Sequence, residues 1–392
     1  MCVQPCIQYY AWQVEVMLTN FKNLRIHEEF NVQTLWAFNK NEADWEEKRA
    51  IIKKVEDAYS DVAEFHYYED TREYPISYIS SIRPNVLKQH FQAFPELSQE
   101  TIFYHDCDVV FSRFPLFLHN YQQKDNNWYV SDTISYIGHD YILSKGDDVL
   151  KKMCDIVGIY KDEVRVRQGQ SGGAQYIMKN VDFNFFHKVE KDSEKLFKEI
   201  NELNNKKKQA DPTHHELQIW CADMWAVLWN AWMRGYNTNV IKEMDFCWAT
   251  DSAKTWDEKI LFHNAGVTGN PNEKLFYKGK YIAQLPYEDD GLDYDPERAS
   301  YKYFEIVKSI GKIHVYMGLF DKIQEIVTAY STMMNPTEEQ KQVAARRLQI
   351  CMTCEAWRNV PIDHCSKCGC ATKAKVFTPK GQEACPMGKW TI

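Results

Sequence analysis

The stretch FYHDCDVVF, residues 103–111, places Asp106 and Asp108 inside an apolar run. Apolar residues on both sides of the two aspartates predict a buried strand. Burial of two like charges without compensation is very unfavourable. Either each carboxylate has a basic or amide partner inside the protein, or the pair serves as a set of ligands.

Two carboxylates spaced i, i+2 along a strand point to the same face, and at a strand end both can reach one hard cation. Mg²⁺ and Mn²⁺ prefer oxygen ligands and complete their coordination with water and substrate phosphates. Asp106 and Asp108 therefore predict a Mn²⁺ or Mg²⁺ site that presents the ion to a diphosphate. A D-x-D triplet also occurs by chance in many proteins, so the rest of the chain has to support this interpretation.

Strand and helix patterns alternate along the first third of the chain. Apolar runs predict strands over 2–6, 32–38, 64–70 and 101–111, and amphipathic patterns predict helices over 12–24, 46–59 and 81–94. This order predicts an α/β fold with a mostly parallel sheet and helices on both faces. In such sheets ligands bind beyond the carboxyl ends of the strands, and the two aspartates lie toward such an end.

Bulk properties exclude some classes of function. The chain has 392 residues, which is long enough for more than one domain, and its net charge of -8 gives no reason to expect general nucleic-acid binding. No apolar run approaches the roughly 18–20 residues of a membrane span. The N-terminal sequence MCVQPCIQYYAWQVEVML lacks the charged start and cleavage site of a signal peptide, so a cytoplasmic location is expected.

Half of the twelve cysteines lie in the C-terminal stretch 351–392. Cytosolic thiols stay reduced, so cysteines at this density predict a metal site and a separate module. Two C-x-x-C pairs have the spacing of a structural Zn²⁺ site, and the two further cysteines leave open which four bind zinc or whether an iron–sulfur site forms. The six candidates are Cys351, Cys354, Cys365, Cys368, Cys370 and Cys385.

Three motifs together resemble the nucleotide-sugar glycosyltransferases of the GT-A fold, in particular their family-eight type. They are the D-x-D at the end of an apolar strand, QGQSGGAQYIMKN at 168–180, and ILFHNAGVTGN at 260–270. The resemblance covers roughly residues 1–285, as order and type of motif. It implies a Rossmann-like GT-A domain that transfers a sugar from a UDP- or GDP-linked donor to a hydroxyl of a glycan, protein or small molecule.

The resemblance also implies roles for individual residues. His263 would be the third metal ligand beside Asp106 and Asp108, and imidazole suits manganese. Ser171, Gly172 and Gly173 would line the donor sugar, because glycine lets a ring approach the backbone, although an ordinary loop-to-strand turn is the alternative. Asp132 would hydrogen-bond the hydroxyls of that sugar.

Arg83 opens the helix before the D-x-D strand, and the resemblance implies that this position reaches the donor diphosphate. A guanidinium suits phosphate oxygens, and a surface salt bridge is the alternative. Asp70 and Arg72 are weaker candidates for the same region. The lysine, proline and tryptophan that often follow the family's histidine are replaced here by VTGNP. A lysine contact to the diphosphate is therefore missing at that place, and Lys274 or Arg83 would substitute for it.

Tyr9, Tyr10 and Trp12 follow the first strand, where the family binds the nucleoside base. A ring there would stack on uracil or guanine, and packing in the core is the equal alternative. Asp223 lies in the predicted helix 214–236 among tryptophans. The resemblance implies that an acidic residue in such a helix faces the acceptor, so Asp223 is the expected catalytic residue, with Glu216 as second choice. It would act as general base or stabilise positive charge at the anomeric carbon.

The expected organisation is a GT-A domain over 1–285, a helical connector over 286–350 and a Cys-rich zinc module over 351–392. An apolar stripe of Ile323, Ile326, Val327 and Tyr330 indicates that the connector packs on the catalytic domain or self-associates. The tail contains CPMGKW at 385–390 and resembles short tails of phage and bacterial proteins, which suggests docking. Two alternatives remain: a non-catalytic sugar-nucleotide or glycan-binding protein, and a metal-dependent nucleotidyltransferase or phosphatase.

Overall fold

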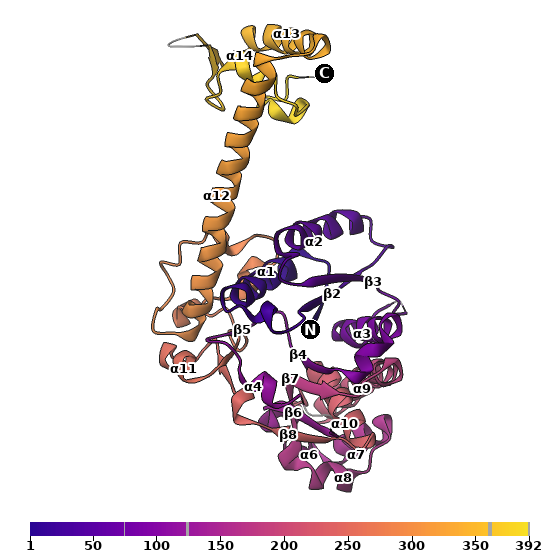
Figure 1. The fold of residues 1–392 in the computed structure, drawn as a ribbon. Helices are drawn as coiled ribbons and strands as arrows, with labels where there is room; N and C mark the ends of the chain where they lie inside the picture. The colour runs from indigo at the N-terminus through magenta and orange to yellow at the C-terminus, as the bar shows by residue number, and fades with distance from the viewer. Residues whose placement is uncertain (74, 123–124, 360–362, 391–392) are drawn as a thin grey trace. The chain divides into compact units, whose positions relative to one another are not determined.

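The structure is a computed structural model that describes the chain except residues 74, 123–124, 360–362 and 391–392 (Figure 1). For 271, 312–324 and 382 it describes the backbone alone. The chain divides into two compact units, Met1–Ile310 and Gly311–Ile392. The division falls inside one long helix, whereas the sequence-based boundaries lie at 285 and 350.

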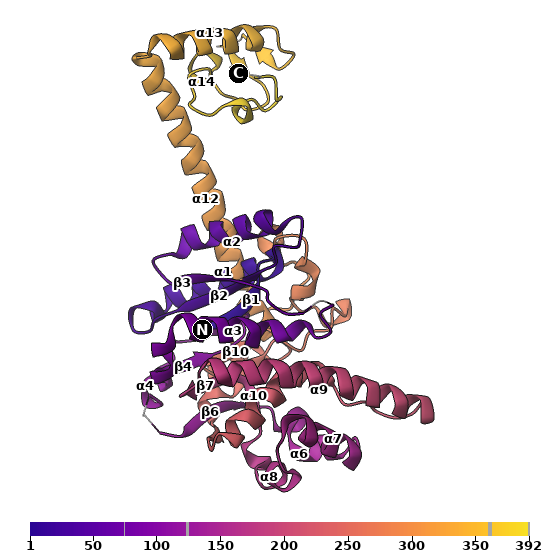
Figure 2. The same cartoon turned by 90° about the vertical axis from the view of Figure 1, so that its right-hand side faces the viewer.

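The first layer of unit 1 is an all-parallel sheet in the order β1-β2-β3. Its strands are β1 (Cys2–Pro5), β2 (Gln33–Phe38) and β3 (Glu64–Glu69), and its helices are α1 (Gln8–Asn23), α2 (Trp45–Tyr59) and α3 (Ile82–Ala93). Helix α3 lies on one face of the sheet, and α2, with α1 packed beside it, lies on the other (Figure 2). The predicted strand–helix alternation with helices on both faces is confirmed for this layer.

The remaining strands of unit 1 form two mixed sheets, one of four strands and one of three, so the expectation of a single mostly parallel sheet holds only in part. One has the order β4-β7-β6-β8 and the other has the order β5-β10-β9. Their strands are β4 (Thr101–Tyr104), β7 (Gly172–Lys179), β6 (Asn127–Asp132), β8 (Asn237–Val240), β5 (Val109–Phe111), β10 (Leu261–His263) and β9 (Phe246–Trp248). Helix α10 (Ala222–Met233) packs on β7 and β8, and α9 (Phe183–Ala210) packs on both α10 and α3.

The predicted strand 101–111 is two strands that belong to different sheets. Strand β4 ends at Tyr104 and β5 begins at Val109, and the polar residues lie in the turn between them. The Val109 amide donates to the Asp106 carbonyl at 3.3 Å, which closes this turn. The chain therefore crosses from one sheet to the other at the two aspartates. Asp106 and Asp108 lie in the connecting turn and belong to neither strand.

Short helices connect these elements. They are α4 (Phe117–Asn120), α5 (Ile134–Ile137), α6 (His139–Leu143), α7 (Asp147–Val157), α8 (Lys161–Val166) and α11 (Ala253–Glu258). Many of the large aromatic side chains lie in the core, and Trp12, Trp36, Trp128, Trp225 and Trp229 are all fully buried. Core packing therefore accounts for much of the high aromatic content.

Helix α12 (Ala299–Met334) begins in unit 1 and ends in unit 2. A capping box of Thr337 and Gln340 starts α13 (Glu338–Met352). Ile326, Val327 and Tyr330 of the predicted stripe are exposed, while the side chain of Ile323 lies outside the described residues.

The C-terminal module of unit 2 has little regular structure. It contains the two-stranded pair β11 (Trp357–Arg358) and β12 (His364–Cys365), followed by α14 (Thr372–Lys375). Its small core includes the buried Trp390, with the Arg347 guanidinium 4.7 Å from that ring. In the part of the chain that the structure describes, no helix has both the length and the apolar composition to cross a bilayer.

Candidate metal site

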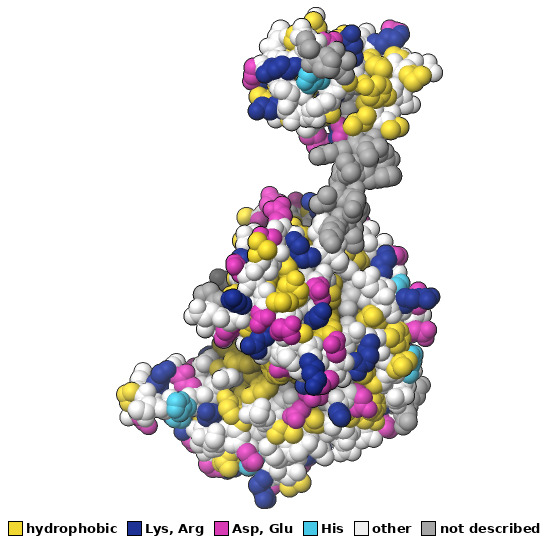
Figure 3. All heavy atoms as spheres, turned by 90° about the vertical axis from the view of Figure 1, so that its left-hand side faces the viewer, with side chains coloured by type: hydrophobic (Ala, Val, Ile, Leu, Met, Phe, Trp, Pro, Cys, Tyr) yellow, Lys and Arg dark blue, Asp and Glu magenta, His cyan; other side chains and the backbone are white. Residues whose placement is uncertain are grey.

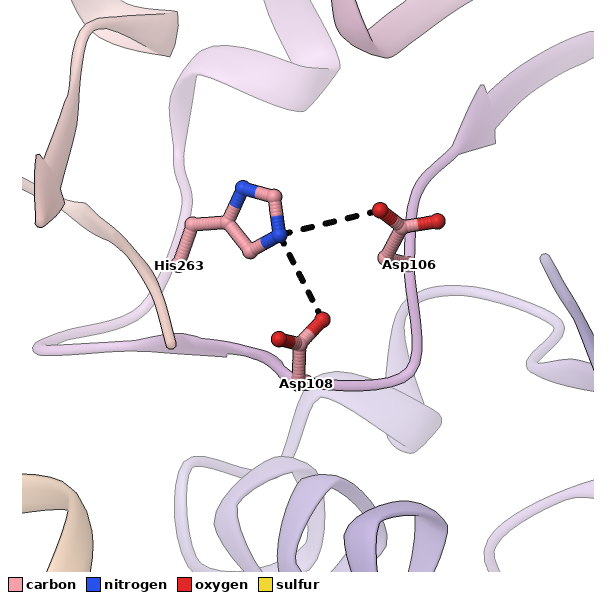
Figure 4. A group of neighbouring side chains, drawn as sticks. All are labelled: Asp106, Asp108 and His263. Atoms are coloured by element: carbon pink, nitrogen blue, oxygen red, sulfur yellow. Dashed lines mark ion pairs between the residues drawn. The ribbon is translucent and has the colours of Figure 1, made fainter. Parts of the chain in front are cut away.

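Two aspartates from one turn and a histidine from a distant part of the sequence converge at the junction of the two mixed sheets. Asp106 and Asp108 come from the turn between β4 and β5, and His263 is the last residue of β10. Antiparallel pairing of β10 with β5 sets His263 opposite Val109, so the ladder brings the imidazole to the aspartates. The three side chains point toward one another, and one ligand atom of each lies within 4.8 Å of the others (Figure 4).

The distances at this site fit a shared ligand. His263 Nε2 lies 3.6 Å from Asp106 Oδ2 and 3.4 Å from Asp108 Oδ1. Asp108 is only 3% exposed, His263 is also buried, and Asp106 is half-buried. Among the described residues, these are the only three His, Cys, Asp or Glu side chains whose ligand atoms come this close together. The predicted convergence of Asp106, Asp108 and His263 is confirmed.

The other ring nitrogen of His263 is held by a residue that the sequence did not single out. Gln175 Nε2 lies 3.1 Å from His263 Nδ1, and Ser131 Oγ donates to Gln175 Oε1 at 2.6 Å. Gln175 reaches this place because the pairing of β6 and β7 shifts between Val130 and Ser131. All three polar side chains are buried, so this network fixes the plane of the imidazole.

Each aspartate also has a basic partner. Arg83 Nη1 donates to Asp106 Oδ1 at 2.7 Å, and the Lys278 ammonium pairs with the Asp108 carboxylate. Burial by itself would raise the pKa of Asp108, but Lys278 and His263 lower that pKa below its ordinary value. These are the internal partners that an interpretation without metal requires, and they leave Asp108 ionised.

The two pairs lie beside a cavity of about 460 Å³. Charged side chains on its wall are Arg83, Asp106, Asp223 and Lys278, beside the imidazole of His263, while most of the other lining residues are apolar or aromatic. Figure 3 shows a hollow on one face of unit 1 with hydrophobic side chains inside it and charged side chains around it. Both acids are thus paired with bases, and Asp106 and His263 also border a space large enough for a ligand.

Asp223 lies in the first turn of α10, with its carboxylate on the same cavity. Tyr78 Oη donates to Asp223 Oδ1 at 2.6 Å, and Arg83 Nε lies 3.3 Å from Oδ2. Arg83 therefore bridges Asp223 and Asp106. The predicted helix 214–236 is too long, because α10 begins only at Ala222, after a 3-10 turn at Ile219–Cys221. Glu216 precedes this turn and pairs with Lys208 instead of lining the cavity.

Trp220 is an aromatic side chain at the cavity that the sequence reasoning did not distinguish from its neighbours. Its side chain is 58% exposed, while Trp225 in the next helix is fully buried. The Trp220 ring is near-parallel to Tyr136, with centroids 6.4 Å apart, and both residues line the cavity. The sequence does not distinguish the exposed Trp220 from the many tryptophans around it that are buried in the core.

Tyr9 and Tyr10 lie in the first turn of α1, because this helix starts at Gln8, earlier than predicted. Their rings meet edge to face with centroids 5.0 Å apart. Burial raises the pKa of Tyr9, while the charge of Lys278 lowers it and that of Asp108 raises it. Among the described residues that line the cavity, neither tyrosine appears. Trp12 is 1% exposed and donates to the Tyr281 carbonyl, which favours the core-packing alternative for that residue.

The glycines at 172 and 173 have different surroundings. A Cβ on Gly172 would lie 2.2 Å from Val130 Cγ2, so the contact between β7 and β6 requires a glycine there. A Cβ on Gly173 would lie 2.6 Å from the Tyr176 hydroxyl, at the cavity wall. Ser171 is buried, and the exposed Asp132 accepts a hydrogen bond from the Ile134 amide.

Lys274, proposed as a phosphate contact, is exposed and does not line the cavity in the part of the chain described, whereas Lys278 does. Asp70 and Arg72 pair with each other at 2.8 Å. Arg72 also donates to the carbonyls of Tyr78 and Ile79, so this pair fixes the segment that leads into α3.

The six C-terminal cysteines are free thiols that form two neighbourhoods. Burial raises the pKa of Cys351, and the nearby Cys385, Cys365 and Cys354 raise it further. Lys375 Nζ lies 2.8 Å from Cys368 Sγ, and Cys370 Sγ lies 3.7 Å from the Cys368 carbonyl oxygen. The cysteines are therefore clustered, but the choice of four ligands stays a prediction.

A search against protein-family models and a search of curated proteins both returned no match for this chain. A proposal about function therefore depends on the chemistry of the residues around the cavity.

Proposed function

We propose that this protein is a metal-dependent glycosyltransferase of the GT-A type. It would move a sugar from a UDP- or GDP-linked donor to an acceptor hydroxyl of a glycan, a protein or a small molecule. The observation that carries the proposal is the convergence of Asp106, Asp108 and His263. Two of the three, Asp106 and His263, line a cavity that Arg83 and Asp223 also line.

The donor atoms at the site suit Mn²⁺ or Mg²⁺. Two carboxylates and one imidazole supply oxygen and nitrogen, and a cation held by so few side chains keeps positions open for phosphate oxygens. Asp106, Asp108 and His263 would hold the ion, and Gln175 would orient the imidazole. A bound cation would supply charge stabilisation for the departing nucleoside diphosphate.

The residues of the chain supply the remaining positive charge. Arg83 and Lys278 both line the cavity, one beside each aspartate. A guanidinium donates two parallel hydrogen bonds to phosphate oxygens, and an ammonium offers a mobile point charge on a flexible stem. We assign the diphosphate to the space between these two side chains.

Asp223 would act at the sugar. Its carboxylate is held by Tyr78 and Arg83, so its position is fixed before any ligand binds. At that place it would take the proton of the acceptor hydroxyl or stabilise positive charge at the anomeric carbon. The exposed Trp220, with Tyr136 behind it, offers a flat surface on which a sugar ring stacks.

The test is donor hydrolysis and transfer with a panel of UDP- and GDP-sugars in the presence of Mn²⁺. Wild type is expected to release the nucleoside diphosphate, and Asp108→Asn is expected to lose this activity. Asp257→Asn, which changes an exposed acid of α11, is the matched control and should behave as wild type. Release of pyrophosphate from a nucleoside triphosphate would instead identify a nucleotidyltransferase. A Mn²⁺-dependent thermal shift without turnover would identify a binding protein.

For the C-terminal module we propose a structural Zn²⁺ held by four of its six cysteines. A core this small does not hold a fold together without a metal or disulfides. Its proposed role is docking to a partner or to the acceptor.

A further inference from the structure

Both acids of the proposed metal site are already neutralised by side chains of the chain itself. The ammonium of Lys278, on the 3-10 turn Lys278–Tyr281, pairs with Asp108 from 170 residues away in sequence. Arg83 does the same for Asp106. The two cations thus occupy the electrostatic role that a divalent ion would take, and both line the cavity.

A divalent ion bound to Asp108 would repel the Lys278 ammonium, which contacts the other oxygen of the same carboxylate. Asp108 is nearly inaccessible to solvent, and like charges a few ångströms apart repel strongly in such surroundings. If Asp108 turns to an ion, the Lys278 ammonium loses its carboxylate, and it then needs another anion nearby. The phosphates of the donor are the anions expected in the cavity.

Arg83 is less free to move than Lys278. The Arg83 guanidinium contacts two carboxylates, Asp106 at 2.7 Å and Asp223 at 3.3 Å, so it keeps one partner if the other is lost. Among the ion pairs of the described residues, Lys278 has only Asp108. Its flexible four-carbon stem also lets the ammonium swing into the cavity.

We propose that Lys278 exchanges between two anions: it neutralises Asp108 in the empty site and binds a phosphate once a divalent cation has taken Asp108. This inference rests on the proposed function, because it needs a cation and a diphosphate at this site. It assigns to one residue the coupling between them: the metal releases the lysine, and the released lysine binds the diphosphate. Metal and nucleoside diphosphate then favour each other's binding.

The exchange predicts that loss of the Lys278 charge strengthens the binding of Mn²⁺ alone and weakens the binding of the nucleoside diphosphate. In Lys278→Met, Mn²⁺ alone no longer competes with an ammonium and is expected to bind about tenfold more tightly than in wild type. At saturating Mn²⁺, UDP or GDP is expected to bind about tenfold more weakly, because a charge-assisted contact to phosphate is gone. Isothermal titration and manganese electron paramagnetic resonance measure both affinities without any turnover.

Three further variants keep the test decisive. Lys278→Gln retains a hydrogen-bond donor for Asp108 and serves if the methionine variant folds poorly. Lys278→Arg restores a cation and should return the affinity for Mn²⁺ alone toward the wild-type value. Lys280→Met removes a neighbouring lysine that pairs with Asp289, and it should change neither affinity.

The outcomes separate this inference from the proposed function. If wild type, Lys278→Met and Lys278→Gln bind Mn²⁺ alone with equal affinity, the exchange is wrong but the metal site stands. If both variants bind Mn²⁺ and nucleotide more weakly than wild type, Lys278 has a structural role and the exchange is again wrong. Absence of Mn²⁺ binding in wild type, or binding that Asp108→Asn leaves unchanged, overturns the proposed function itself. Tighter metal binding with weaker nucleotide binding supports the exchange.

Discussion

Gln175 and His263 meet through their side chains, with Gln175 Nε2 3.1 Å from His263 Nδ1. In this arrangement Nδ1 accepts, so Nε2 carries the proton and donates toward the two aspartates. A metal at Nε2 requires the other tautomer, with the proton on Nδ1. Rotation of the Gln175 amide by 180° supplies this state, because its oxygen then accepts from Nδ1 and its NH₂ donates to Ser131 Oγ.

Gln175→Leu is therefore expected to weaken Mn²⁺ binding by about 10- to 100-fold, the usual effect of losing the partner of a metal-binding histidine. Gln175→Glu should bind Mn²⁺ at least as well as wild type, because a carboxylate accepts from Nδ1–H without rotation. Titration with Mn²⁺ measures both. Leucine and glutamate variants with the same affinity would show that Gln175 only fills space.

Asp108→Asn is expected to destabilise the metal-free protein more than Asp106→Asn. The asparagine at 108 leaves the Lys278 ammonium without its only ion-pair partner among the described residues, whereas Arg83 retains Asp223 when Asp106 is changed. Loss of one member of a buried pair costs about 3–5 kcal/mol, and the partial exposure of Lys278 reduces this to about 2 kcal/mol. Urea unfolding in the presence of a chelator gives the two values, and equal losses would contradict the expectation.

Asp223→Asn is expected to reduce kcat by about 10²- to 10⁴-fold, because the neutral amide neither takes a proton nor stabilises positive charge. Mn²⁺ affinity should change little, since Asp223 is not among the three ligands. Glu216→Gln is the matched control from the same stretch of sequence, because Glu216 pairs with Lys208 and should leave kcat unchanged. Steady-state kinetics with the donor found in the panel measure both. A loss of activity in the Glu216 variant as well would argue against a specific role for Asp223.

Acid sensitivity is expected from His90, whose imidazole is fully buried. Burial, with a smaller effect of His66, lowers the pKa of His90 to about 3. The unfolded chain has an ordinary histidine pKa of about 6.5 and so takes up the proton first. Above about pH 6.5, the ionisation of His90 does not change the free energy of unfolding. Below that pH, the free energy of unfolding falls by up to about 1.4 kcal/mol per pH unit until about pH 3.

His90→Gln should remove this part of the pH dependence. Glutamine still offers a donor for Gln33 and an acceptor for Tyr68, the two partners of the ring. Urea unfolding of both proteins at several values between pH 7.5 and pH 4.5 gives the difference in slope, in which the shared effect of the carboxylates cancels. Parallel curves would mean that His90 does not govern acid stability.

The C-terminal module is expected to contain one zinc ion per chain. Single Cys→Ser changes at Cys351, Cys354, Cys365, Cys368, Cys370 and Cys385 should abolish zinc in four cases and leave it in two. Elemental analysis of the purified variants measures this. A chelator should unfold the module while Mn²⁺ binding by unit 1 persists after the chelator is removed. Iron in the purified protein would contradict the assignment, and so would zinc that is still present in each of the six single variants.

The sequence located the metal-site residues because they conflict with their surroundings. Charged residues in an apolar run, and a histidine after another apolar run, stand out locally, and those positions converge as predicted. Lys278 and Gln175 gave no such signal, because each reaches the site through tertiary contacts with partners far away in sequence. No periodicity or spacing marks them.

The errors in the secondary structure have a similar origin. The run 101–111 has the composition of one strand, and only its pairing shows that β4 belongs with β7 while β5 belongs with β10. The helix predicted over 214–236 contains no glycine or proline before Gly235, so its start could not be seen locally. In the structure α10 starts where the Asp223 amide donates to the Tyr78 hydroxyl at 3.1 Å, a contact with a residue from another part of the chain.

The turn that carries Asp106 and Asp108 is also the covalent passage from β4 in one sheet to β5 in another, and β5 pairs with the strand that ends in His263. An ion bound by the aspartates of this turn and by His263 would crosslink the sheet that contains β4 to the sheet that contains β5 and β10. Filling the site would then stiffen the scaffold as well as prepare it for chemistry, and slower amide exchange would appear at the ends of both strands together.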